Sequence, residues 1–278
     1  MCAINGSFAY GTDALPVERS ELLRVRDAMT ARGPDAAGLW LSEDARVGFA
    51  HRRLAIIDLS EGGAQPMRDP DTGNWICFNG EIYNHQSLRA RLNSQGITTR
   101  TQSDTEVLLK LYAREGTGMF ADLRGMYAFA LWDAGRRELL LARDPFGIKP
   151  LYVADDGRTV RFASQVKPLL QTPIDRRPEA AGHAGFLLWG SVPEPYTFYR
   201  GIRALPAGHW QRFANGCATP AVCFANVLDT LRQLPSAAQG HRENALDQIA
   251  AAVKDSVAAH MVADVPVGVF LSAGLDST

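Results

Sequence analysis

A cysteine follows Met1 in this chain of 278 residues, and its side chain is the first candidate for chemistry. Methionine aminopeptidase removes a methionine that precedes so small a side chain, which would leave a thiol and a free α-amine on Cys2. The α-amine has a pKa of roughly 8, so it can take the thiol proton as the sulfur attacks a carbonyl. Taken alone, however, a cysteine at this position is more often a small buried residue at the start of a strand than a nucleophile.

A second candidate is the sequence Phe78-Asn79-Gly80-Glu81, which stands at the end of an expected strand. The side-chain amide of Asn79 and the next backbone N–H can point at one spot. Two such donors would stabilise the oxyanion of a tetrahedral intermediate. The alternative is an ordinary Asn-Gly turn.

Charged residues near these positions offer ways to hold a substrate. Arg52 and Arg53 precede an apolar run, and a guanidinium fork suits a carboxylate, although adjacent arginines are more often a solvated loop. Asp104 stands in Ser-Asp-Thr-Glu at the start of an expected helix. It is suited either to cap that helix or to bind an ammonium group.

The bulk composition excludes several classes of protein. There are 29 basic and 30 acidic residues, so no overall charge favours nucleic acid or an anionic membrane. The four cysteines lack CxxC spacing, and the N-terminus lacks the pattern of a secretory signal. The apolar runs are too short to span a bilayer. We therefore expect a soluble cytoplasmic protein with reduced thiols.

Short β-type runs dominate the first two hundred residues, with two amphipathic helical stretches between them. The helical stretches cover residues 18–29 and 105–114. The expected strands cover residues 3–9, 47–50, 75–79, 127–132, 138–142, 151–153 and 159–163. Such a mixture predicts an α+β layered sandwich rather than a doubly wound parallel fold.

The chain changes character after residue 213. Residues 214–240 are rich in alanine with Pro and Gly, which is typical of a linker. A long helix is predicted from residue 241 on, followed by a buried strand at 265–271. A loop of small residues, 272–277, follows that strand. Such a loop leads into a helix whose N-terminus would bind a phosphate group.

Together these motifs resemble the glutamine amidotransferases with an N-terminal cysteine, and most of all the glutamine-dependent asparagine synthetases. The matching segments are residues 1–2, 32–35, 51–58, 63–67, 78–85, 103–106, 123–130 and 143–152. The resemblance implies a four-layer αββα sandwich of the N-terminal-nucleophile hydrolase type. The first helix and strand of a truncated α/β ATP-pyrophosphatase domain would follow it. The implied bounds are 2–213 for the glutaminase domain, 214–240 for the linker and 241–278 for the start of the synthetase domain.

Carried over residue by residue, the resemblance implies that Cys2 attacks the side-chain amide of glutamine and forms a glutamyl thioester. Asn79 and Gly80 would supply the oxyanion hole. Arg53 would bind the α-carboxylate of glutamine, and Glu81 with Asp104 would bind its α-ammonium. Residues 32–35 and 144–150 are assigned to shaping the site. No metal or cofactor is implied for this hydrolysis.

The final loop resembles the pyrophosphate-binding loop with which the synthetase half of the family binds ATP. The implied ATP-binding residues are Leu271, Ser272, Gly274, Asp276 and Ser277, while Ala273 stands where the family usually has glycine. In the whole enzyme, ATP and Mg²⁺ would activate aspartate, and ammonia from glutamine would convert it to asparagine. Members of the family also form homodimers.

Two other functions stay open at this stage. The chain could be a stand-alone glutaminase, or an amidotransferase acting on another carboxylate acceptor. It could also be a non-catalytic glutamine-binding module, against which the presence of Cys2 argues.

Overall fold

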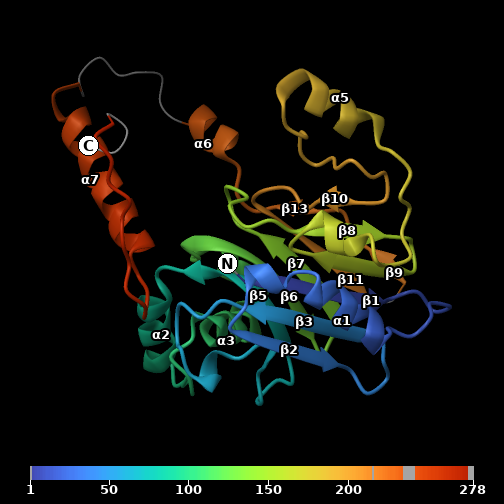
Figure 1. Ribbon diagram of the computed structural model, residues 1–278. Coiled ribbons are helices and arrows are strands. Elements are labelled where there is room, and N and C mark those ends of the chain that lie inside the picture. Colours follow the sequence, from blue (N-terminus) through green and yellow to red (C-terminus); the bar gives the residue numbers. More distant parts are fainter. Residues whose placement is uncertain (1, 215, 234–241, 275–278) are drawn as a thin grey trace.

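Two antiparallel sheets lie face to face in this protein (Figure 1). The computed structural model describes residues 2–214, 216–233 and 242–274. Sheet A has the order β10-β8-β9-β1-β3-β2, and its strands are β1 (Ala3–Ala9), β2 (Ala36–Leu41), β3 (Val47–Arg53), β8 (Tyr152–Asp155), β9 (Thr159–Ala163) and β10 (Arg203–Ala204).

Sheet B has the order β12-β11-β7-β6-β5-β4, and β13 also pairs with β11. Its strands are β4 (Met67–Arg68), β5 (Trp75–Ile82), β6 (Gly125–Asp133), β7 (Glu138–Arg143), β11 (His209–Ala214), β12 (Cys217–Ala218) and β13 (Val222–Cys223). Each of the seven strands expected in the first two hundred residues is present, with shifts of a few residues at the ends.

Alternating apolar side chains fill the space between the two sheets. Sheet A contributes Ile4, Phe8 and Phe49, which pack against side chains of sheet B such as Ala128 and Leu141. Because successive side chains of a strand point to opposite faces, the other half of each strand packs outward against helices.

Helices cover both outer faces. Helices α1 (Arg19–Asp27) and α4 (Val166–Leu169) pack on sheet A, and helices α2 (His85–Ser94) and α3 (Asp104–Glu115) pack on sheet B. The layers are therefore αββα, which confirms the predicted α+β sandwich.

Helix α3 has clear start and stop signals. The side chain of Ser103 accepts the backbone N–H of Thr105, and Gly116 ends the helix at a φ of 56°. Nearly the whole helix is buried, including Val107, Leu108 and Leu111 against sheet B. This packing fixes the first turn of α3, where Asp104 lies.

The C-terminal part agrees only partly with the sequence prediction. Within the expected linker, β12 and β13 pair with β11, and α6 (Val227–Gln233) follows. Helix α7 (Arg242–His260) confirms the expected long helix. Helix α5 (Ala180–Trp189) lies apart from the sheets (Figure 1).

The prediction of a buried strand at residues 265–271 is wrong. These residues have no strand assignment, and Val269, Phe270 and Leu271 are exposed. A buried strand needs neighbouring strands to bond its backbone groups, and no described strand lies beside this segment. Among the described residues, no helix has the length and apolar composition needed to cross a membrane.

Candidate functional site

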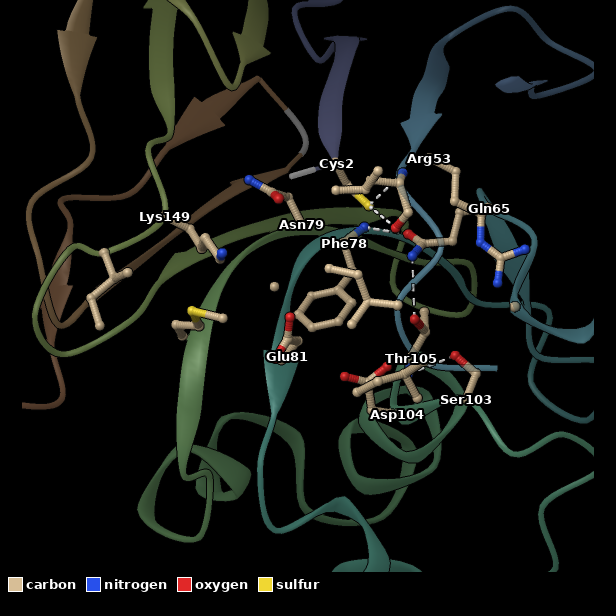
Figure 2. Close-up of a pocket in the computed structure, with 17 residues that line it drawn as sticks. Cys2, Arg53, Gln65, Phe78, Asn79, Glu81, Ser103, Asp104, Thr105 and Lys149 are labelled. Carbon is tan, nitrogen blue, oxygen red and sulfur yellow. Dashed lines mark hydrogen bonds between the residues drawn. The ribbon is translucent and has the colours of Figure 1, made fainter. Parts of the chain in front are cut away.

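A cavity of about 350 Å³ opens where β1, β3 and β5 meet the first turn of α3 (Figure 2). This volume lies within the range of small-molecule sites, roughly 300–1,000 Å³. The structure brings six sequence-predicted residues together on its walls: Cys2, Arg53, Asn79, Gly80, Glu81 and Asp104.

Cys2 lies directly before β1 and is half-buried. Its Sγ lies 3.4 Å from both the backbone N and the backbone O of Leu54, and Arg32 Nε donates to the carbonyl of Cys2 at 3.2 Å. Burial raises the pKa of the Cys2 thiol, while the Leu54 backbone, the N-terminal charge and the nearby cations Arg53 and Lys149 act in the opposite direction. The thiol therefore needs a base, or more positive charge, to become a thiolate at neutral pH.

The edge of β5 that faces away from β6 borders the pocket. Phe78 N–H donates to Gln65 Oε1 at 2.6 Å, and Ile82 N–H donates to Asp104 Oδ2 at 3.0 Å. Gly80 lies between these two residues, and alternate residues of a strand direct their N–H groups to the same edge. The N–H of Gly80 thus points at the pocket.

The pairing of β5 with β6 supports this direction. Tyr127 lies opposite Gly80, and both backbone groups of Tyr127 bond Asp144 on the other side of β6. Tyr127 and Gly80 therefore form a non-hydrogen-bonded pair. The approach is so close that a Cβ on Gly80 would lie 2.2 Å from Met126 O, so only glycine fits.

Asn79 provides the second donor. Its side chain is 1% exposed, and among the described residues its Nδ2 has no hydrogen-bond partner. A buried amide without a partner costs stability, so its presence beside the thiol calls for an acceptor that arrives with a ligand. Figure 2 shows Asn79 and Cys2 on the same side of the pocket.

Arg53 ends β3 and folds back onto the loop that follows. Its Nη1 donates to Ser60 O at 2.9 Å, and its Nη2 donates to Asp58 O. A Cβ on Gly63 would lie 2.1 Å from Nη2, so glycine leaves the space that the guanidinium occupies. With five N–H donors, the guanidinium retains further donors for a carboxylate.

Two buried carboxylates, Glu81 and Asp104, also line the pocket. Burial raises the pKa of Glu81, and burial raises the pKa of Asp104 to about 6 although the N–H groups of Ile82 and Thr105 oppose this. Within the described residues neither carboxylate forms an ion pair, although the charge of Lys149 lowers the pKa of Glu81 against the effect of burial. A cationic group in the pocket would therefore stabilise both carboxylates further. The pocket thus offers a cation at Arg53 and acceptors for an ammonium group.

Lys149 is a pocket residue whose position the sequence reasoning missed. It is 4% exposed and lies on the other side of the pocket from Arg53 (Figure 2). Burial lowers the pKa of Lys149, while the negative charges of Glu81 and Cys2 oppose this. The only signal in the sequence was a lysine within the apolar stretch Gly-Ile-Lys-Pro-Leu.

The turn that carries Lys149 is built around Asp144. The carboxylate of Asp144 accepts the backbone N–H groups of Phe146, Ile148 and Lys149 at 2.9–3.0 Å. On the opposite wall, Asp35 accepts the N–H of Ala55 at 2.8 Å. Both segments support the walls of the pocket, which is the role expected of them.

The predicted ATP residues are not part of this pocket. Leu271, Ser272 and Gly274 are exposed, while Asp276 and Ser277 lie outside the described residues. Within the described ranges, no group of three His, Cys, Asp or Glu side chains is arranged to hold a metal ion.

Comparison with known proteins gives two family matches. Residues 1–224 match the model of the glutamine amidotransferase domain, and residues 248–278 match that of asparagine synthase. The two matches leave residues 225–247 between them.

Curated relatives align along the whole chain. The glutamine-hydrolysing asparagine synthetase 1 of Bacillus subtilis is 38% identical over 280 residues, and asparagine synthetase B of Escherichia coli is 37% identical over 279 residues. Each alignment covers 100% of this chain but only 43% and 44% of the respective relative. The chain therefore spans less than half the length of these proteins.

A solved structure shares the fold. The glutamine phosphoribosylpyrophosphate amidotransferase of Bacillus subtilis superposes with a TM-score of 0.58 at 19% identity. The superposition covers 81% of this chain and 49% of the other. At this identity, the likeness concerns the fold alone.

Proposed function

Because the chain belongs to the glutamine amidotransferase domain family, we propose that its pocket hydrolyses the side-chain amide of glutamine with Cys2 as the nucleophile. The observation that carries the proposal is the grouping of the Cys2 thiol with two donors, the Gly80 N–H and Asn79 Nδ2, in one pocket. A nucleophile with hydrogen-bond donors for the carbonyl oxygen beside it is the arrangement that acyl transfer requires.

The reaction begins once removal of Met1 has freed the α-amine of Cys2. The amine accepts the thiol proton as Sγ attacks the amide carbon of glutamine. Negative charge develops on the carbonyl oxygen, where the N–H of Gly80 and the amide of Asn79 stabilise it. The protonated amine then gives its proton to the leaving nitrogen, ammonia departs, and water hydrolyses the thioester to glutamate.

The charged walls of the pocket suit the zwitterionic end of glutamine. The guanidinium of Arg53 pairs with the α-carboxylate. Glu81 and Asp104 accept hydrogen bonds from the α-ammonium, whose positive charge stabilises these buried carboxylates.

For the whole protein we propose glutamine-dependent synthesis of asparagine from aspartate. This rests on the names of the relatives and on the asparagine synthase match of residues 248–278. ATP and Mg²⁺ belong to this proposal for the whole protein only. Residues 271–274 are exposed and form no cradle that fits a phosphate group.

Two further properties belong to the same proposal. Cys217 and Cys223 are exposed free thiols, which suits a reducing cytoplasmic location. A homodimer stays a prediction from the family resemblance.

The test uses the 278-residue chain, L-glutamine and an enzymatic assay for released glutamate. Intact mass should show that Met1 is removed, and Cys2→Ala should abolish glutamate release. Cys223→Ala replaces an exposed free cysteine that does not line the pocket and should keep full activity. Undiminished glutamate release by Cys2→Ala would disprove the mechanism.

A further inference from the structure

The segment that follows α7 contacts the loop at the rim of the pocket. The backbone N–H of Asp58 donates to Asp264 Oδ2 at 2.7 Å, and the backbone N–H of Asp264 donates to Ile56 O at 2.9 Å. The first of these bonds joins residues that are 206 positions apart in the chain. Residue 264 also lies inside the segment that matches the asparagine synthase model.

The contacted loop is part of the pocket itself. Leu54, Ile56 and Ile57 line the cavity, and the backbone of Leu54 holds the Cys2 thiol. Asp58 then supplies the carbonyl oxygen to which Arg53 Nη2 donates. A displacement of this loop would therefore move the Leu54 backbone away from the Cys2 thiol and would also move the guanidinium of Arg53.

Asp58 is held in an unusual conformation by its neighbours. Its φ of 51° lies in the left-handed region, which is uncommon for a residue with a side chain, although Asp adopts it more readily than most. Its carboxylate accepts the N–H of Gln102, its carbonyl oxygen faces Arg53, and its N–H is bound by Asp264. Asp264 is the only one of these partners that comes from the C-terminal segment.

We propose that Asp264 is a positioning residue for glutamine, which fixes Asp58 and through it the guanidinium of Arg53. The inference rests on the proposed function and deepens it, because it makes the affinity for glutamine depend on the C-terminal segment. A change in the position of that segment would alter the site at Arg53 without touching the substrate, which is a coupling between two parts of the chain.

Other contacts hold helix α7 itself without reaching the pocket loop. Arg124 forms an ion pair with Asp255 of α7, and the rings of Tyr83 and His260 lie 4.6 Å apart. Asp255 therefore provides a matched control, since Asp255→Ala removes an exposed carboxylate from α7 but leaves the bonds to Ile56 and Asp58.

The experiment compares Asp264→Ala, Asp264→Asn and Asp255→Ala in the 278-residue chain. Asp264→Ala should raise the KM for glutamine about three- to tenfold with kcat within about twofold, because a charge-assisted hydrogen bond to the loop is lost. Asp264→Asn keeps an oxygen acceptor and should restore most of the affinity. Asp255→Ala should leave KM unchanged. Thermal unfolding of each variant checks that the fold is intact.

A binding measurement separates this inference from the proposed function. Calorimetric titration with L-glutamine in a Cys2→Ala background should show weaker binding when Asp264→Ala is added. If wild type lacks glutaminase activity but this difference is found, the proposed reaction fails and the positioning role stands. An unchanged Kd and KM in Asp264→Ala, or no binding of glutamine to any variant, would overturn the inference.

Discussion

The carboxylate of Asp104 accepts the backbone N–H of Ile82 at 3.0 Å, which joins the first turn of α3 to the pocket edge of β5. This bond holds Asp104 beside Glu81 in the pocket, with its side chain almost wholly buried. The same carboxylate thus has a structural partner and an orientation suited to a substrate ammonium.

The first prediction concerns the pH dependence of glutamine binding. Since burial raises the pKa of Asp104 to about 6, its charge is present above that pH and lost below it. Binding of the α-ammonium should therefore weaken as the pH falls through about 6. Calorimetry with Cys2→Ala, which removes the thiol from the titration, should show a rising Kd between about pH 7 and pH 5.

Asp104→Asn is the matching variant for this prediction. It should bind glutamine more weakly at pH 7 and show a smaller change of Kd with pH, with the remainder due to Glu81. An identical pH profile in Asp104→Asn and its parent would show that Asp104 does not sense the substrate charge.

The second prediction concerns the oxyanion hole. Asn79→Ala removes a buried donor that has no partner among the described residues, so kcat for glutamine hydrolysis should fall about 10²- to 10³-fold. KM should change by less than about threefold, since this bond strengthens only in the transition state. Steady-state glutamate release measures both constants. Asn93→Ala, at an exposed position on α2, should match wild type.

The third prediction concerns Lys149 and the reactivity of Cys2. The positive charge of Lys149 acts to lower the pKa of Cys2, against the effect of burial. Lys149→Met should therefore raise that pKa further and slow alkylation of Cys2 by iodoacetamide at pH 7 by about threefold or more. Peptide mass spectrometry over a range of pH follows Cys2 separately from the other cysteines.

Lys167→Met is the control for this measurement, because Lys167 is exposed and does not line the pocket. Its alkylation profile should overlay that of wild type. A Lys149→Met profile with an unshifted midpoint would show that Lys149 has no electrostatic effect on the thiol.

The sequence predicted those parts of the fold and site that depend on local patterns. Residues 3–9 and 159–163 carry apolar side chains that alternate with polar ones or follow one another. They form β1 and β9 as expected. Asn79 and Gly80 stand at the end of the expected strand 75–79, and β5 continues through them to Ile82. The directions of the Asn79 side chain and the Gly80 N–H therefore follow from the strand. The resemblance added Glu81 and chose between the roles left open for Arg53 and Asp104, and the structure places all three on the same pocket.

Other parts depend on contacts between distant residues and were not predictable. Strand β2 lies at the edge of sheet A, has no fully buried residue and shows no alternation. Helix α2 carries only Leu88 and Leu92 as buried apolar residues, too few for a clear periodic pattern. Conversely, residues 265–271 have the apolar character of a strand but no strand partner among the described residues, and apolarity alone does not satisfy backbone groups.

The fourth prediction tests the space around Arg53. A Cβ on Gly63 would lie 2.1 Å from Nη2 of Arg53 and 2.7 Å from the carbonyl oxygen of Asp58, and both distances are much shorter than a van der Waals contact. Gly63→Ala must therefore displace the guanidinium from the site where it meets the α-carboxylate. The KM for glutamine should rise about tenfold or more, because such an interaction contributes to ground-state and transition-state binding alike.

Gly118→Ala separates this effect from a general cost of adding a methyl group. The nearest atom to a Cβ at Gly118 is 3.9 Å away, so this variant should keep the KM of wild type. In Gly63→Ala, kcat at saturating glutamine should stay within about threefold of wild type, since Cys2, Asn79 and Gly80 are not displaced directly. A normal KM in Gly63→Ala would mean that Arg53 does not bind the α-carboxylate, whereas a lost kcat with normal KM would place Arg53 in the chemical step instead.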